Sequence, residues 1–153
     1  MLAEVTQIAS LAEITLHVGY GTFEPVRVDD VKVHSVSGEH FEISVAAAQT
    51  INAARANGGR VIVIGTTTLR ALESAASEDR TVAHGSGVAT LTIKPGYQFR
   101  IADALLTNFH LPRSSLLILV SAFAGREFIG RAYNHAVKER YRFYSYGDCM
   151  LIL

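Results

Sequence analysis

The stretch Arg60-Val-Ile-Val-Ile-Gly-Thr-Thr-Thr-Leu-Arg-Ala-Leu-Glu-Ser-Ala-Ala76 decides the fold. It begins with a β-branched apolar run, passes through Gly65 and three threonines, and continues with Leu69, Leu72 and Ala76 at helical spacing. This order predicts a buried parallel strand, a polar turn and a helix. Since α/β proteins bind ligands at the carboxyl ends of such strands, next to helix N-termini, Gly65 to Arg70 is the first candidate site.

The elements before this stretch alternate in type. Helical spacing begins at Leu2, and Ile14 to Val18 alternates as a strand does before a glycine-containing polar loop. Ser44 is a suitable N-cap for an alanine-rich helix that the Gly58-Gly59 pair closes. That helix leads directly into the strand at Arg60.

The elements after the stretch include a predicted β-hairpin. Residues Val88 to Ile93 and Tyr97 to Ile101 alternate, and Lys94-Pro-Gly96 between them suits a type II turn. The further prediction is a short buried strand at 104–106, helices at 115–124 and from 127 to about 140, and a final strand at 149–153. The alternation of strands and helices predicts a single α/β domain over residues 1–153. We expect a mixed, mostly parallel sheet with helices on both faces and one antiparallel hairpin.

Composition limits the function classes. The chain has 153 residues, is 49% hydrophobic and has a formal net charge of zero, so an RNA partner requires a local basic patch. A single cysteine, Cys149, excludes an internal disulfide framework and a multi-cysteine zinc site. Neither a signal peptide nor an apolar run of membrane-spanning length is present, which predicts a soluble cytoplasmic protein with no membrane partner.

Polar residues follow three predicted strands, and the ends of parallel strands meet at one edge of a sheet. The first group is His17, Gly19, Gly21 and Thr22, the second is Gly65, Thr66, Thr67 and Arg70, and the third is Thr107, Asn108 and His110. Asp148, before the last strand, is a further candidate. If the three ends converge, the crevice contains two histidines for proton transfer, hydroxyls, an amide and a guanidinium suited to a carboxylate.

Each of these residues also has a structural interpretation. The threonines suit helix caps, Arg70 and Glu73 suit a solvated i, i+3 ion pair, and a strand-end histidine is often a satisfied structural side chain. Neither a Walker sequence nor a dinucleotide fingerprint occurs, and the histidine spacing predicts no metal site. The aromatic run Tyr141 to Tyr146 suits a buried sheet, although Lys138, Arg140 and Arg142 beside it suit RNA phosphates.

Five segments of the chain resemble one enzyme family. They are Thr15-Leu-His-Val-Gly-Tyr-Gly-Thr-Phe23, Val61 to Ala76, Asp103-Ala-Leu-Leu-Thr-Asn-Phe-His-Leu-Pro112, Leu119 to Gly125 and Tyr141 to Met150. Together they resemble the C-terminal half of the S-adenosylmethionine:tRNA ribosyltransferase-isomerases of queuosine biosynthesis. The resemblance extends through nearly all of the chain.

The resemblance implies transfer and isomerisation of the ribosyl group of S-adenosylmethionine to 7-aminomethyl-7-deazaguanine in tRNA. The product is epoxyqueuosine, with adenine and methionine released, and S-adenosylmethionine is a substrate, so no separate cofactor is expected. Such a reaction needs a base next to the sulfonium, an acid for adenine and groups that hold carboxylate and ribose. We expect His17 and His110 to transfer protons and Arg70 to bind an anion. The residues expected to position the substrate are Gly19, Thr22, Gly65, Thr66, Thr67, Thr107, Asn108 and Asp148.

Two differences from the family stand out. Its members are usually much longer, and their N-terminal half, with an inserted β-barrel, has no counterpart here, so we expect a fragment that pairs with a missing half or dimerises. The family also commonly has Met-His-Ser-Glu where this chain has Val36-Ser-Gly-Glu39, so one histidine is replaced by Ser37. Two alternatives follow: a catalytically inert half that binds ligand or needs a partner chain, and an unrelated nucleotide-binding domain, which the missing phosphate loop disfavours.

Overall fold

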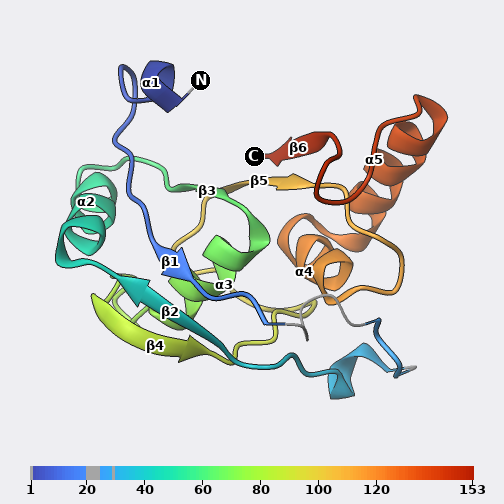
Figure 1. The fold of residues 1–153 in the computed structure, drawn as a ribbon, viewed down its shortest axis with the longest axis horizontal. Coiled ribbons are helices and arrows are strands. Elements are labelled where there is room, and N and C mark those ends of the chain that lie inside the picture. The colour runs from blue at the N-terminus through green and yellow to red at the C-terminus, as the bar shows by residue number, and fades with distance from the viewer. Residues whose placement is uncertain (1, 20–24, 29) are drawn as a thin grey trace.

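A computed structural model describes residues 2–19, 25–28 and 30–153 (Figure 1). Its helices are α1 (Leu2–Val5), α2 (Val45–Ala56), α3 (Thr66–Ser74), α4 (Ser115–Ala124) and α5 (Arg126–Lys138), with a 3₁₀ turn, η2, at Val31–Val33. Its strands are β1 (Thr15–Leu16), β2 (Glu39–Ile43), β3 (Ile62–Ile64), β4 (Gly85–Ala89), β5 (Ala104–Asn108) and β6 (Cys149–Ile152).

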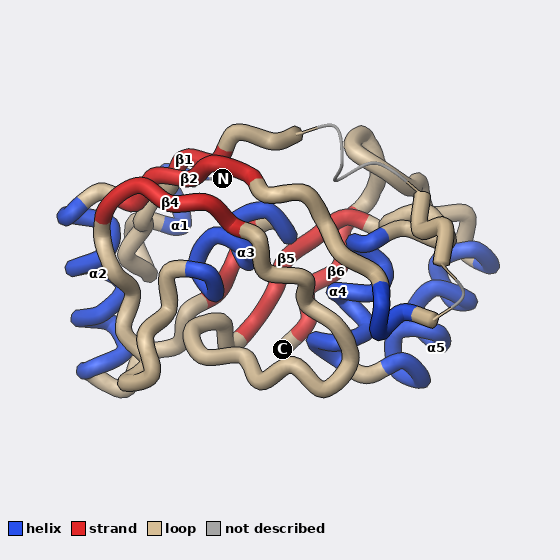
Figure 2. Tube along the Cα trace, turned by 90° about the horizontal axis from the view of Figure 1, so that it is seen from below, coloured by secondary structure: helices blue, strands red, loops and turns tan. Residues whose placement is uncertain are grey.

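The strands form two three-stranded sheets with α3 between them. One sheet is antiparallel in the order β1-β2-β4, and the other has the order β3-β5-β6. Helix α3 contacts strands of both sheets, as Figure 2 shows from below, and its buried Leu69 and Leu72 join the core with Ile43 and Leu105. The helix of the opening stretch is therefore the central layer of the molecule. Helices α4 and α5 pack together at one end, and α2 lies at the other (Figure 1).

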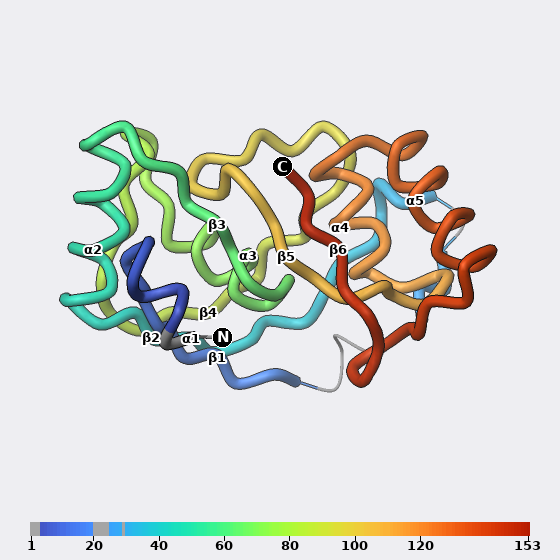
Figure 3. Tube along the Cα trace, turned by 90° about the horizontal axis from the view of Figure 1, so that it is seen from above, coloured from blue at the N-terminus to red at the C-terminus, as the bar shows by residue number. Residues whose placement is uncertain are grey.

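The α/β class is confirmed, but two details of the predicted sheet are wrong. Only β3 and β5 pair in parallel among the described strands, while β5 and β6 are antiparallel. Helices do not cover both faces of this sheet: Figure 3 looks onto a face where the strands are uncovered, and there Ile62 and Ile64 are 51% and 53% exposed. The apolar pattern of residues 61–64 predicted burial on both faces, whereas only alternate residues face the core, with Val63 buried and Val61 partly buried.

The predicted hairpin at 88–101 is also wrong, although its turn is present. Gly96 has a φ of +95°, and the Tyr97 N–H donates to the Lys94 carbonyl over 3.0 Å. The segment after the turn forms no strand, because its backbone donors bind a buried carboxylate instead. The N–H groups of residues 100, 101 and 102 donate to the two carboxylate oxygens of Glu73 over 2.9, 2.9 and 3.1 Å.

The predicted helix ends are largely confirmed. The Ser44 and Ser114 hydroxyls accept from Ala47 and Leu117 N–H groups at the starts of α2 and α4, and Gly125 ends α4 with a φ of +85°. Among the described residues, no helix is both long and apolar enough to cross a bilayer.

Candidate functional site

A cavity of about 230 Å³ lies at the carboxyl ends of β3 and β5. We call it the strand-end cavity. Its lining residues are Val18, Gly65, Thr66, Thr67, Thr107, Asn108, His110, Leu116, Tyr144 and Ser145. The structure therefore brings together the predicted residues of two strand ends except Arg70, whereas the first strand end contributes Val18. None of these lining side chains is an acid or a permanent cation.

The parallel pairing of β3 and β5 places the two polar segments side by side. Ile64 pairs with Leu106, and the Gly65 N–H donates to the Leu106 carbonyl over 2.9 Å. The polar segments that follow β3 and β5 therefore leave the sheet next to each other. Gly65 is the N-cap of α3 with a φ of +91°, a conformation that favours glycine, and no side chain caps the helix. The first N–H groups of α3 are therefore available to an anionic or polar ligand at the cavity.

His110 is the titratable side chain with the largest shift in this cavity. Its Nε2 lies 3.1 Å from Thr107 Oγ1, and its backbone N–H donates to the Tyr133 hydroxyl over 2.8 Å. Burial lowers the pKa of His110 from 6.5 to about 4. The imidazole is therefore neutral at pH 7, a form that accepts a proton rather than donating one as imidazolium.

Several predicted site residues lie outside the cavity lining. His17 is exposed, and its backbone N–H donates to the His40 carbonyl. Gly19 donates its N–H to Glu39 over 2.9 Å. Asp148 forms an ion pair with Arg142 at 2.9 Å, and this hydrogen bond lowers the pKa of the Asp148 carboxyl. Thr22 and Gly21 lie outside the described residues.

Arg70 is inside the protein rather than at the cavity. Its Nη1 is 2.6 Å from Glu39 Oε2, and the two side chains are 4% and 1% exposed. The remaining guanidinium donors bind the carbonyls of residues 37, 89 and 91. Burial lowers the pKa of Arg70, and the Glu39 charge opposes this shift. The structural alternative of an Arg70–Glu73 pair is wrong, since Glu73 binds Tyr97 and the 100–102 backbone instead.

Sequence reasoning missed Glu39, Tyr144 and the contact between His34 and Ser115. For Glu39 a signal existed, because its alternation with Phe41 and Ile43 places a carboxylate on the buried face of β2, where it requires a cationic partner. His34 Nε2 lies 2.8 Å from Ser115 Oγ, and desolvation, followed by the Lys94 charge, lowers the pKa of His34. These two residues are far apart in sequence, so no local pattern relates them. Within the described ranges, no three His, Cys, Asp or Glu side chains group as metal ligands.

The fold and the cavity define an α/β protein with a cavity at the ends of parallel strands, the place where α/β proteins commonly bind ligands. Residues 1–152 match the family described as queuosine biosynthesis protein, and the chain belongs to that family.

Similar proteins include several that are named S-adenosylmethionine:tRNA ribosyltransferase-isomerase. The protein from Ralstonia nicotianae is 58% identical over 91% of this chain and 39% of its own length. The protein from Dechloromonas aromatica is 55% identical over 99% of this chain and 44% of its own length. The crystal structure of S-adenosylmethionine tRNA ribosyltransferase from Thermotoga maritima is 39% identical and has a TM-score of 0.78 over 99% of this chain and 48% of that one. The chain thus spans less than half the length of these relatives.

Proposed function

We propose that this chain forms the S-adenosylmethionine site of an S-adenosylmethionine:tRNA ribosyltransferase-isomerase. In the proposed reaction, the ribosyl group passes to 7-aminomethyl-7-deazaguanine in tRNA and rearranges, giving epoxyqueuosine with release of adenine and methionine. The supporting observation is the strand-end cavity, in which hydroxyls, an amide, helix N–H groups and a neutral imidazole from distant segments line one space. S-adenosylmethionine is the substrate in this proposal, and no separate cofactor is required.

The lining residues suit the separate parts of this substrate. Thr66, Thr67 and Thr107 offer hydroxyls, and Asn108 an amide, to ribose hydroxyls, while the α3 N–H groups suit the methionine carboxylate. Tyr144 supplies an aromatic ring, a group that attracts cations such as a sulfonium. In this assignment the neutral His110 accepts the proton next to the sulfonium.

The predicted residues outside the lining have proposed supporting roles. His17 precedes Val18 of the lining, and we assign it the second proton-transfer role when the tRNA is bound. Arg70 acts through Glu39, which holds the Gly19 backbone, and not by direct contact with the ligand. Asp148 shapes the segment that carries Tyr144, and Thr22 stays a candidate ligand contact.

The partners are part of the proposal. A tRNA carrying 7-aminomethyl-7-deazaguanine is the acceptor, which places the protein in the cytoplasm. The exposed apolar face with Ile62 and Ile64 suits a cover formed by the part of the family architecture that this chain does not span. A second copy of this chain is the alternative cover.

The test of the function is adenine release. The chain is incubated with S-adenosylmethionine and precursor tRNA, and adenine is followed by chromatography for the wild type, His110→Gln and His17→Gln. The expected result for the wild type is tRNA-dependent adenine formation. In His110→Gln the rate of adenine formation should fall at least about a hundredfold, because the variant lacks the general base. Near-normal turnover in both variants would remove the two histidines from the mechanism.

A second candidate function is a half that binds ligand without turnover. The observation that favours it is the coverage of 39 to 44% of the relatives' length, together with the uncovered sheet face. In that case the chain binds S-adenosylmethionine but forms no adenine, whereas a full-length relative under the same conditions does.

A further inference from the structure

The segment between α5 and β6 is a folded arm at the edge of the strand-end cavity. We call residues 139–148 the aromatic arm. The Tyr144 N–H donates to the Phe109 carbonyl over 2.8 Å, and Asn108 Nδ2 reaches the Asp148 carbonyl over 3.3 Å. Tyr144 and Ser145 line the cavity with His110. The arm is therefore one wall of the proposed site, next to the predicted site loop in space although far from it in sequence.

The arm holds its shape through contacts along its inner side. The Phe143 ring packs on Phe109 and Tyr133 with centroids 5.4 and 5.8 Å apart, and Tyr141 packs on Phe109 at 5.7 Å. Arg142 and Asp148 close the arm with the ion pair and with two further hydrogen bonds: the Arg142 N–H donates to the Asp148 carboxylate, and the Asp148 N–H donates to the Arg142 carbonyl. A tight turn brings Gly147 so close to the Arg142 carbonyl that an added Cβ would clash with it. The arm is thus an ordered turn and not a loose connection.

The outer side of the arm presents tyrosines to solvent. Tyr146 is 96% exposed, while Tyr141 and Tyr144 are 41% and 42% exposed. Tyr146 is too exposed to serve the core, while Tyr141 and Tyr144 each leave part of the ring accessible to a partner. Aromatic rings of this kind are the groups on which unpaired RNA bases stack.

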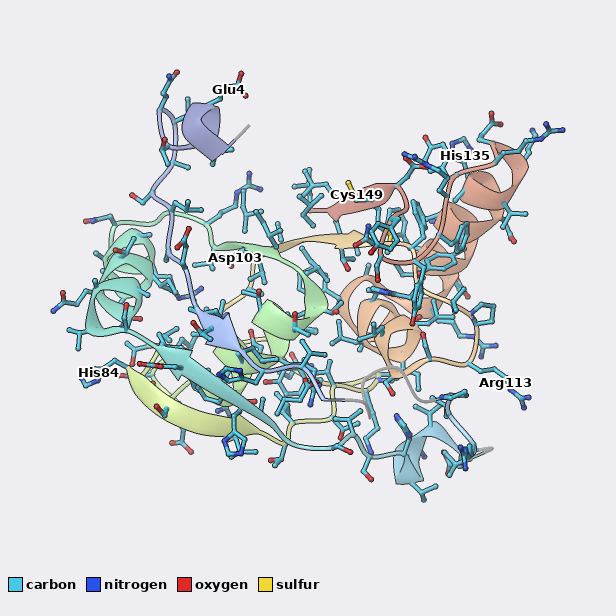
Figure 4. All side chains as sticks on the ribbon, viewed as in Figure 1. Glu4, His84, Asp103, Arg113, His135 and Cys149 are labelled. Atoms are coloured by element: carbon cyan, nitrogen blue, oxygen red, sulfur yellow. The ribbon has the colours of Figure 1, made fainter. Side chains whose placement is uncertain are left out.

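Helix α5 and the arm have a net positive charge, although the net charge of the whole chain is zero. Helix α5 and the arm together, residues 126–148, contain five basic side chains against three acidic ones, an excess of two positive charges. The basic residues are Arg126, Arg131, Lys138, Arg140 and Arg142, and the acidic ones are Glu127, Glu139 and Asp148. Arg131 and Lys138, seven residues apart on α5, lie on one face opposite the buried Ile129 and Ala136. In Figure 4, His135 marks α5 and Cys149 marks where the chain enters β6 beyond the arm. The positive charge is thus concentrated beside the exposed tyrosines.

We propose that the aromatic arm, which includes Arg140, together with Lys138 at the end of α5, is the surface that binds the unpaired loop of the tRNA carrying the reacting base. Tyr146 stacks on a base that flanks the one entering the cavity, and the two cations contact phosphates. This inference rests on the proposed function, because it names where the macromolecular substrate of that site lies. Arg142 is engaged with Asp148 and serves the shape of the arm.

The test measures tRNA affinity by fluorescence anisotropy across a salt series, using the whole chain. Tyr146→Ala should weaken binding roughly tenfold, whereas Tyr146→Phe, which keeps the ring, should bind as the wild type does. Lys138→Ser with Arg140→Gly should lower the slope of log affinity against log salt by about 1.4, or about 0.7 for each lost phosphate contact. Arg140 has a φ of +58°, so glycine suits this position and lost binding does not reflect unfolding.

The controls separate this inference from the proposed function. Arg60→Ser removes one exposed charge from the segment that follows α2, and α2 lies at the opposite end of the molecule from α5 (Figure 1), so the slope should stay unchanged. S-adenosylmethionine binding, measured separately, should be the same in all arm variants. Wild-type affinity in Tyr146→Ala and an unchanged salt slope in the double variant would overturn the inference while leaving the ligand site intact. Absence of tRNA binding by the wild-type chain would overturn it as well.

Discussion

His110 combines a buried imidazole with a position at the proposed ligand. Its folded-state pKa of about 4 lies below the ordinary value of 6.5, so the unfolded chain takes up the proton first as the pH falls. Stability is therefore fully present above pH 6.5 and decreases as the pH falls toward 4, by up to about 3 kcal/mol. Urea unfolding of the wild type and His110→Asn between pH 7 and 4 measures this. Equal pH dependence in both proteins would contradict the burial argument, and the exposed His17→Asn is the control.

Arg70 and Glu39 form a buried ion pair whose partners depend on each other. Arg70→Leu removes the cation that neutralises the buried Glu39 carboxylate, so we expect it to lower the free energy of unfolding by about 3 to 5 kcal/mol. Adding Glu39→Leu should restore part of that loss, since no charge then stays buried. Denaturant curves of the two single variants and the double variant measure the coupling. Additive losses would contradict it, and Arg142→Leu, in an exposed pair, should change stability little.

The sequence predicted which polar residues gather at the cavity better than it predicted which side chain pairs with Arg70. Thr66, Thr67, Thr107, Asn108 and His110 reach one cavity because strand ends meet where parallel strands pair, a rule that needs no coordinates. The partner of Arg70 lies 31 residues earlier in the chain, and helical spacing instead indicated Glu73. Long-range polar pairs of this kind depend on how the layers stack, which local spacing does not specify.

At the level of elements, α2 and α5 end in the same C-terminal capping motif, in which one residue has a positive φ, but different residues form it. In α2, Gly58 has a φ of +74°, and the N–H groups of Gly58 and Gly59 donate to the carbonyls of Arg55 and Ala54. In α5, Arg140 occupies the equivalent position, and the N–H groups of Arg140 and Tyr141 donate to Val137 and Ala136. The Gly58-Gly59 pair allowed the first end to be predicted, whereas no glycine marks the second.

This comparison gives a stability prediction for Arg140→Gly. An L-residue in the left-handed region carries a conformational cost that glycine avoids, so the substitution should raise the free energy of unfolding by about 1 kcal/mol. Thermal and urea unfolding measure it. Gly58→Arg is the reciprocal control and should destabilise by a similar amount, while a loss of stability in Arg140→Gly would contradict the motif assignment.

At the level of the whole molecule, the β3-β5-β6 sheet has an uncovered apolar face and an open edge at β3. A groove of about 420 Å³ runs along β3, lined by its residues, by residues 10–14 and by α2 and α3. Sequence alternation could not reveal which face of β3 is exposed, because β3 is apolar throughout and only the position of α3 decides which face is covered. Exposed apolar strands at a sheet edge favour association with another chain.

We therefore expect the isolated chain to self-associate as its concentration rises. Ile62→Thr with Ile64→Lys should shift sedimentation toward the monomer, because both side chains are about half exposed on that face. Val137→Lys, an exposed apolar position on α5, is the matched control and should not change the distribution. A wild-type chain that is monomeric at every concentration would contradict the prediction.

The central claim, that the strand-end cavity binds S-adenosylmethionine, is tested most directly by calorimetric titration of this ligand into wild type, Thr67→Val and Thr50→Val. Thr67 lines the cavity, whereas the Thr50 hydroxyl donates to the Ala46 carbonyl within α2. We predict saturable binding to the wild type and to Thr50→Val, and roughly tenfold weaker binding to Thr67→Val, in which a ligand hydroxyl loses its partner. Equal affinity in Thr67→Val and the wild type, or no saturable binding to any of the three folded proteins, would contradict the claim.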